Sequence, residues 1–271
     1  MAGRRIADAA AGWQGRTVRD LCRIVVAGLW LLSLPGAAEE VRVLPAPGSS
    51  AWQPLTFRSV ERPTTYIPFG EPEAGVRAEA DCSASALVLP LEEIDLSRTP
   101  VLRWRWRILQ RLDVEDERSR SGDDFAARVY VMFRFEPDRA SLLERFRRGV
   151  GERLFGAEMP GTALSFVWSS RVASGAIWTN PYAAEARMIA LASGPGSGWR
   201  AEAVDLPASY ASAFGHPPPQ ATGIGLMTDA DDTCQHAVAE YKDFRLTPSE
   251  PAGPARNPEA AAPGGVSSPP G

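Results

Sequence analysis

The amino-acid sequence predicts an all-β protein: a two-sheet antiparallel sandwich of the jelly-roll type, with one or two short helices inserted. Residues 101–108 and 125–135 alternate strictly between two kinds of side chain, which is the period of a β-strand with one buried face. Short apolar runs separated by Pro and Gly lie on both sides of them. Because a strand with one apolar face needs a second layer to cover it, two packed sheets are the simplest solution.

The same alternation predicts which side chains face outward. The face opposite the apolar one is rich in guanidinium groups, which belong to Arg103, Arg105, Arg107, Arg128 and Arg134. If residues 101–108 pair with residues 125–135, these arginines form one exposed patch around Tyr130. The alternative is an ordinary solvated surface whose arginines are neutralised by acidic neighbours.

The rest of the chain is dense in short strands. Further strands are expected at residues 55–57, 64–68, 76–80, 84–89, 163–169, 187–191, 199–205, 223–228 and 238–246. Helical spacing of apolar residues is found in residues 139–155 and 206–214. The last strand precedes a segment rich in Pro, Gly and Ala, so we expect it to pair back against an early strand.

The first 38 residues have the order of a secretory signal. Arg16, Arg19 and Arg23 precede an apolar run over residues 24–34, and small residues follow up to Ala38. The run is well short of the roughly 20 residues that span a bilayer. We therefore expect cleavage after Ala38 and a periplasmic location, with an uncleaved membrane anchor as the alternative. The expected organisation is signal peptide 1–38, linker 39–50, β-sandwich domain 51–247 and disordered tail 248–271.

Composition limits the function. The chain has 29 Lys and Arg against 33 Asp and Glu, a net charge of −4, and removal of the expected signal makes it more acidic. Nucleic acids and anionic membranes select basic surfaces, so neither is an expected partner. The sequence also lacks a Gly-x-Ser-x-Gly elbow, a phosphate loop, a dinucleotide fingerprint and a zinc-spaced Cys/His set. No cofactor is expected, apart from a possible structural Ca²⁺.

Two cysteines, Cys82 and Cys234, remain after the expected cleavage. In an oxidising compartment they can form one disulfide that closes a long loop, which would stabilise the fold by about 4 kcal/mol. Two separate buried thiols are the alternative.

Several motifs together resemble a known family. They are Gly122–Phe133 (GDDFAARVYVMF), Ala163–Trp168 (ALSFVW), Asn180–Tyr182 (NPY), Trp199 with Glu202 and Asp205, and Asp229–Thr233 (DADDT). In this order the chain resembles, over residues 55–246, a bacterial family of exported proteins known as domain of unknown function 3047. The resemblance implies a sandwich similar to carbohydrate-binding modules of the galactose-binding or concanavalin type, and no assigned activity. Cys82 and Cys234 are both unusual for this family, which favours the disulfide.

The acidic residues are candidate metal ligands. Asp123 and Asp124 precede a central strand, while Asp229 and Asp231 lie at the turn between the two last strands. Carboxylate oxygens near a sheet edge are ligands that Ca²⁺ prefers, so these four residues are the predicted calcium site. The alternative is that aspartates at turns cap backbone N–H groups and pair with arginines.

Candidate ligand-binding residues combine cationic and aromatic side chains. Guanidinium groups bind carboxylate or phosphate groups of an acidic glycoconjugate, and aromatic rings stack on sugars. The candidates are Arg105, Arg128, Tyr130, Trp178, Tyr182 and Glu202. For the aromatic residues the alternative is packing beneath a loop, since residues 178–182 are expected to form one.

The favoured function is a non-catalytic, exported module that binds a saccharide or an envelope glycoconjugate. A carboxylate-dependent glycoside hydrolase or lyase is the first alternative, because Glu202, Asp205 and the turn aspartates supply acid and base candidates. A structural envelope protein that binds a protein partner is the second alternative.

Overall fold

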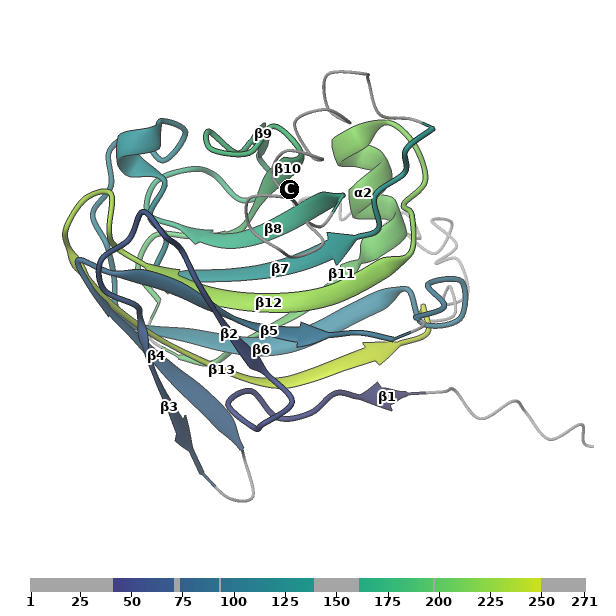
Figure 1. Ribbon diagram of the computed structural model, residues 1–271, viewed down its shortest axis with the longest axis horizontal. Coiled ribbons are helices and arrows are strands. Elements are labelled where there is room, and N and C mark those ends of the chain that lie inside the picture. Colours follow the sequence, from purple (N-terminus) through teal and green to yellow (C-terminus); the bar gives the residue numbers. More distant parts are fainter. Residues whose placement is uncertain (1–40, 71–73, 93, 139–160, 197, 250–271) are drawn as a thin grey trace, which may run out of the picture. The chain divides into compact units, whose positions relative to one another are not determined.

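The structure is a computed structural model that describes residues 41–70, 74–92, 94–138, 161–196 and 198–249. All of these residues belong to the unit that begins at Glu39. They form two β-sheets whose facing side chains share one hydrophobic core (Figure 1), so the predicted two-sheet sandwich is confirmed. The expected signal peptide, the helix predicted over residues 139–155 and almost all of the expected tail lie outside the described residues.

The six-stranded sheet has the order β11-β6-β13-β4-β3, with β1 paired to β13. Its strands are β1 (Arg42–Val43), β3 (Thr65–Phe69), β4 (Gly75–Asp81), β6 (Val101–Gln110), β11 (Arg200–Asp205) and β13 (His236–Thr247). The last strand, β13, pairs with both β4 and β6, which confirms the expected return of the chain end to an early strand. Within residues 39–50, the segment expected as a linker, β1 joins the sheet and Leu44 is buried.

The seven-stranded sheet has the order β2-β5-β12-β7-β8-β10-β9. Its strands are β2 (Gln53–Thr56), β5 (Ala84–Pro90), β7 (Ala127–Phe133), β8 (Thr162–Ser169), β9 (Ile177–Thr179), β10 (Ala186–Ser193) and β12 (Ala221–Asp229). One pair, β8 with β10, is parallel, which the antiparallel prediction did not include. The chain between these two strands supplies the crossover that a parallel pair requires. It also forms β9, in a segment that the sequence predicted to be a loop.

The core follows the predicted alternation. Trp104 and Trp106 of β6 and Val129 and Val131 of β7 are fully buried between the sheets. The rings of Trp104 and Phe166 meet across the core with centroids 5.9 Å apart. Burial of this apolar surface is the main term that holds the two sheets together.

A single α-helix is described, α2 (Leu206–Phe214), at the position the sequence predicted. It begins where Asp205 accepts a hydrogen bond of 2.8 Å from the Ala208 N–H, and it ends at Gly215 in the left-handed conformation. Figure 1 shows α2 near one end of β7 and the short helix η1 (Arg120–Gly122) near the other. None of the helices in the described part of the chain has the length and apolar character needed to cross a bilayer.

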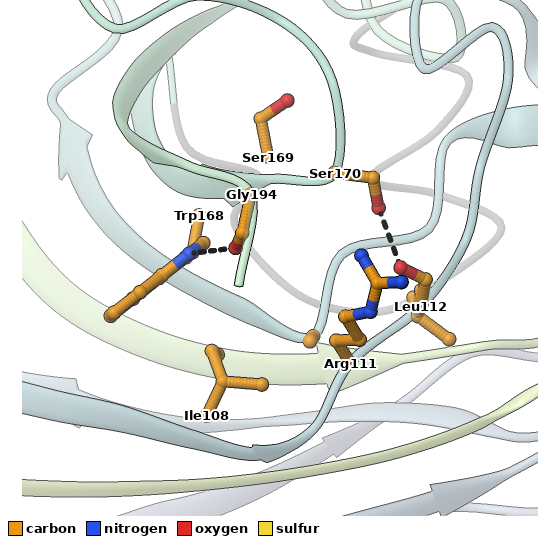
Figure 2. Close-up of a pocket in the computed structure, with 8 residues that line it drawn as sticks. Ile108, Arg111, Leu112, Trp168, Ser169, Ser170 and Gly194 are labelled. Atoms are coloured by element: carbon orange, nitrogen blue, oxygen red, sulfur yellow. Dashed lines mark hydrogen bonds between the residues drawn. The ribbon is translucent and has the colours of Figure 1, made fainter. Parts of the chain in front are cut away.

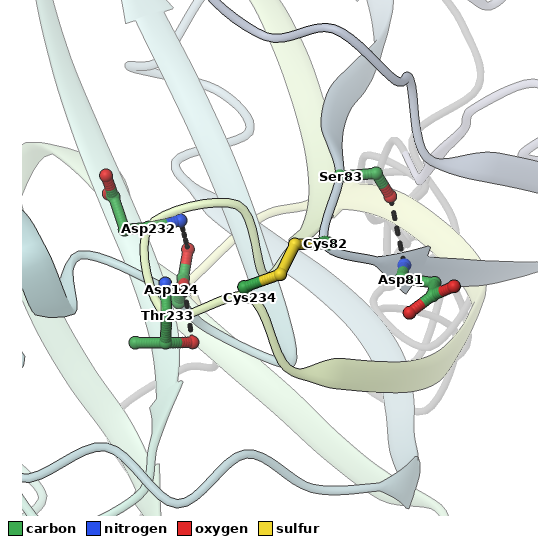
Figure 3. The surroundings of a disulfide bond; sticks show 7 residues. All are labelled: Asp81, Cys82, Ser83, Asp124, Asp232, Thr233 and Cys234. Atoms are coloured by element: carbon green, nitrogen blue, oxygen red, sulfur yellow. Dashed lines mark hydrogen bonds between the residues drawn. A yellow bond between two sulfur atoms is a disulfide. The ribbon is translucent and has the colours of Figure 1, made fainter.

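A disulfide joins Cys82, after β4, to Cys234, before β13 (Figure 3). Next to it the Cys82 N–H donates to the Gln235 carbonyl at 3.0 Å. Both cysteines have positive φ angles, 49° and 50°, a conformation that costs about 1–3 kcal/mol for residues with a side chain. The bridge fixes the acidic turn between β12 and β13 against the end of β4.

Candidate functional site

The outer face of the seven-stranded sheet carries a row of side chains that runs across six strands. Cross-strand pairing places side by side Val88 of β5, Gly225 of β12, Tyr130 of β7, Ser165 of β8, Met188 of β10 and Trp178 of β9. Their sequence neighbours Leu226, Val129, Phe166 and Ile189 belong to the core. Because side chains alternate along a strand, the row faces away from the core. We call these six residues the Tyr130 row.

Two members of the row have buried polar atoms without partners. Among the described residues, the Ser165 Oγ and the Trp178 Nε1 make no hydrogen bond, and Ser165 is fully buried. The other such atom in this part of the chain is the Trp104 Nε1, which lies in the core. A buried polar group without a partner costs about 1–3 kcal/mol. Such groups are rare and call for a physical reason.

Two glycines of β12 have no side chain to project from the centre of this face. At Gly225 an added Cβ would lie 3.6 Å from the Tyr130 Cβ, and at Gly223 it would lie 2.8 Å from the Met132 Cε. The Tyr130 and Met132 side chains therefore lie directly against the backbone of β12. Tyr130 is half-buried, and its hydroxyl donates to the Met227 sulfur at 3.5 Å.

A buried ionic cluster lies at one end of the row's face. The Arg128 Nε donates to the Asp229 Oδ1 at 2.8 Å, its Nη2 donates to the other Asp229 oxygen, and its Nη1 lies 3.4 Å from both Asp123 carboxylate oxygens. All three side chains are buried, and the Phe125 ring lies 4.5 Å from the guanidinium carbon. Burial raises the pKa of Asp229, and the charge of Arg128 opposes that rise.

The family motifs meet at this cluster. Asp124 accepts hydrogen bonds from the Asp232 N–H at 3.2 Å and from the Thr233 N–H and hydroxyl at 2.6 Å (Figure 3). The Asn180 Nδ2 donates to Asp123 at 2.9 Å, and the Tyr182 hydroxyl donates to Asp232 at 2.5 Å. Hydrogen bonds from side chains and backbone N–H groups to carboxylates thus hold the segments GDDF, NPY and DADDT together.

The predicted calcium ligands are brought together only in part. Asp124, Asp231 and Asp232 each place one carboxylate oxygen within 4.8 Å of the others. Asp123 and Asp229 instead face Arg128, whose positive charge competes with a cation for them. Burial first, and then the charge of Asp124, raises the pKa of Asp231. Calcium binding stays a prediction, now with Asp232 in place of Asp123 and Asp229.

The predicted arginine patch is wrong. β6 and β7 do not pair, because each has an apolar face and the two strands lie in opposite sheets on either side of the core. Arg105 therefore lies on the outer face of the six-stranded sheet, far from Arg128 and Tyr130 in the pairing order. Arg128 is also buried rather than exposed.

The remaining predicted ligand residues are distributed over the molecule. Trp178 is in the Tyr130 row, and the exposed Tyr182 donates to Asp232 of the acidic turn. Glu202 accepts a hydrogen bond of 3.0 Å from the Trp106 Nε1 and pairs with Arg200 at the edge of the six-stranded sheet. Sequence reasoning missed Ser165. The sequence feature that could have indicated Ser165 is a hydroxyl at an outward position within the apolar motif ALSFVW.

A small cavity near the end of β8 is not a ligand site (Figure 2). Its volume is about 10 Å³, which is room for about one water molecule. Beside it the Trp168 Nε1 donates to the Gly194 carbonyl at 2.9 Å, and the Ser170 hydroxyl donates to the Leu112 carbonyl at 3.0 Å. These contacts join loops at one end of the sandwich.

The two packed sheets define a β-sandwich domain. The chain belongs to the family described as protein of unknown function (DUF3047), whose sequence profile matches residues 50–245. No match was found among curated protein sequences.

Solved structures with a similar course of the chain are β-sandwiches. One is a family 11 carbohydrate-binding module from Clostridium thermocellum in complex with a mixed-linked tetrasaccharide. It has 9% sequence identity and a TM-score of 0.38, and the match covers 78% of this chain and 96% of that chain. A family 30 carbohydrate-binding module of a cellulosomal cellulase from the same organism has 9% identity and a TM-score of 0.41, over 78% and 99% of the chains. An engineered cellulase derived from Rhodothermus marinus has 12% identity and a TM-score of 0.37, over 77% and 99%. Likeness at this level carries no information on a ligand.

Proposed function

We propose that this protein is an exported, non-catalytic domain that binds a saccharide on the Tyr130 row. The observation that carries the proposal is the pair of buried, unpartnered polar atoms, the Ser165 Oγ and the Trp178 Nε1, on the same row as the half-buried ring of Tyr130.

The row offers the two kinds of contact that a sugar needs. Aromatic rings such as Tyr130 and Trp178 present apolar surface together with a polar atom. The hydroxyls of a sugar both donate and accept, so they can satisfy the Ser165 hydroxyl and the Trp178 N–H. From Tyr130 to Trp178 the row crosses three strand spacings, roughly 14 Å. This length suits an oligosaccharide lying across the strands, provided that binding opens access to the buried Ser165 hydroxyl.

Binding is favoured over hydrolysis by the state of the carboxylates. Asp123 and Asp229 are bound to Arg128, and Asp124 is saturated by donors from residues 232 and 233. Asp205 caps α2, and Glu202 is held by Trp106 and Arg200. A general acid or base needs a proton path to its substrate, and these groups already have structural partners.

Export is supported by the disulfide. Disulfides persist in oxidising compartments such as the periplasm and are rare in the bacterial cytosol. The Cys82–Cys234 bridge therefore agrees with the secretory signal that the sequence predicts over residues 1–38.

The test is a panel of immobilised neutral and acidic glycans, followed by titration of the best ligand against three variants. Tyr130→Ala is expected to lower affinity about tenfold, because an aromatic contact is worth up to roughly 1.4 kcal/mol. Ser165→Ala is expected to lower affinity about fivefold, the value of one hydrogen bond. Its melting temperature should be unchanged or higher, because the variant removes an unsatisfied hydroxyl.

Arg105→Gln, on the other sheet, is the matched control and should bind like the native protein. Retention of affinity in both Tyr130→Ala and Ser165→Ala, or a panel with no retained glycan, would overturn the proposal. Release of shortened sugars during the titration would instead favour the hydrolase alternative.

A further inference from the structure

A hollow of about 640 Å³ opens beside the end of β7, at the opposite end of that strand from the ionic cluster. Its described lining residues are Arg42, Leu91, Glu92, Arg134, Gln220 and Thr222. The Arg134 N–H donates to the Gln220 carbonyl at 2.8 Å, next to the pair formed by Phe133 and Ala221. Arg134 and Gln220 are therefore cross-strand neighbours that project into the same space.

Two donors in this hollow have no partner. Within the described part of the chain, neither the guanidinium of Arg134 nor the side-chain amide of Gln220 makes a hydrogen bond or an ion pair, and Arg134 is exposed. Three consecutive prolines, residues 217–219, precede Gln220 and restrict its backbone. Little conformational entropy is lost when a ligand binds to groups on such a rigid segment.

The charge of the hollow selects an anion. Its described lining holds two guanidiniums, of Arg42 and Arg134, and one carboxylate, of Glu92, although the whole chain has a net charge of −4. The Arg42 Nη atoms lie 3.4 Å from the Glu92 carbonyl oxygen, so this arginine is held at the rim. A planar guanidinium binds two oxygens of a carboxylate or phosphate side by side, and an adjacent amide N–H adds a third contact.

We propose that this hollow is an oxyanion subsite in which Arg134 and Gln220 bind a carboxylate or phosphate group of the ligand. The ligand of the domain is then an acidic saccharide or a phosphorylated glycoconjugate. That the anionic group belongs to a saccharide rests on the proposed function. Tyr130 lies in β7, and Arg134 directly follows the last residue of that strand, Phe133. Four residues of extended chain separate Tyr130 from Arg134, about 13 Å. One oligosaccharide of that length reaches both the Tyr130 row and the hollow.

The experiment is an NMR titration that follows the arginine Nε–Hε signals. The ligands are sodium glucuronate, inorganic phosphate and glucose, at constant ionic strength. Both anions should shift the Arg134 signal, and glucose should not. Arg134→Gln should weaken anion binding at least tenfold, since a bidentate charge-assisted pair is lost. Arg245→Gln, which removes the same charge from an exposed site on β13, should change it less than twofold.

The relative affinities of the two anions identify which kind of ligand carries the anionic group. Tighter binding of glucuronate indicates an acidic sugar, and tighter binding of phosphate indicates a phosphorylated ligand; both results support the subsite. Equal effects of Arg134→Gln and Arg245→Gln would show general electrostatic attraction and overturn it. Unchanged anion binding in Arg134→Gln would overturn it as well.

Failure of this subsite is distinguishable from failure of the saccharide face. A neutral oligosaccharide should lose affinity in Ser165→Ala and retain it in Arg134→Gln. Anion binding should show the reverse pattern. Loss of only one of the two patterns identifies which proposal is wrong.

Discussion

The outer faces of the two sheets differ in how their polar groups are used. On the six-stranded sheet Glu240 pairs with both Arg77 and Arg107, at 2.7 Å and 2.5 Å, and Asp243 lies 3.6 Å from Arg105. The Trp199 ring lies over Arg107 and Lys242, at 4.7 Å and 4.4 Å from its centroid.

On the seven-stranded sheet, by contrast, the side chains of Ser165, Trp178, Arg134 and Gln220 make no hydrogen bond within the described part of the chain. Charge alone is therefore a poor guide to a binding site in this molecule. The six-stranded sheet carries the arginines that the sequence made prominent, but Arg105 and Arg107 each lie beside a carboxylate of the protein. The groups to which we assign ligand binding are on the other sheet.

The largest expected effect contrasts one arginine from each face. Arg128→Met leaves Asp123 and Asp229 buried without a counter-charge, and we expect a loss of about 3–5 kcal/mol in the free energy of unfolding. Arg107→Met should cost less than about 1 kcal/mol, because Arg107 is one-third exposed and Arg77 remains beside Glu240. Urea denaturation followed by circular dichroism measures both.

A rescue variant keeps this test decisive if Arg128→Met does not fold. Arg128→Met combined with Asp123→Asn and Asp229→Asn removes the uncompensated charges and should recover part of the lost stability. Equal costs for Arg128→Met and Arg107→Met would contradict the difference between the faces.

The next effect concerns the disulfide that holds the acidic turn beside the seven-stranded sheet. Replacing Cys82 and Cys234 by Ser should lower the free energy of unfolding by about 2–4 kcal/mol, since the bridge closes a loop with a sequence separation of 152 residues. Dithiothreitol should lower the stability of the native protein similarly and leave the double variant unchanged. An effect of dithiothreitol on the double variant would show that the reductant acts elsewhere.

The smallest effect is the pH dependence of Asp231. Its folded-state pKa is raised, so its contribution to stability is complete below about pH 4 and is lost as the pH rises through the folded-state pKa. Asp231→Asn should therefore raise the melting temperature at pH 7, by less than about 4 °C because the group is partly exposed, and have no effect at pH 3.

Asp113→Asn is a control for which the expected change in stability has the opposite sign. Arg171 lowers the pKa of Asp113, so this variant should be less stable than the native protein at pH 7. If calcium binds, the expected effect of Asp231→Asn on the melting temperature has the opposite sign. With calcium bound at Asp124, Asp231 and Asp232, millimolar CaCl₂ would raise the melting temperature of the native protein, and Asp231→Asn would abolish that rise.

The sequence predicted the layers of this fold well, because the alternation in β6 and β7 directly reports which side faces the core. It could not say which strands pair. Two strands with the same alternation fit equally well in one sheet or on opposite sheets, and the wrong choice produced the arginine patch. β9 was missed since its three residues, Ile177–Thr179, are too few to show a period.

The candidate site was harder to predict than the fold. The aspartates of the motifs do converge, but a sequence cannot show that Asp123 and Asp229 share Arg128 or that all three are buried. Ser165 resembles any serine in a buried strand. Its importance depends on the lack of a partner, which is a property of the three-dimensional surroundings alone.

The positions of the last two strands determine when folding can be completed. β12 separates β5 from β7 in one sheet, and β13 separates β4 from β6 in the other. A growing polypeptide that ends before Ala221 therefore has a gap in the middle of both layers, so neither can close. Folding of the sandwich therefore has to wait until residues 221–247 have left the ribosome.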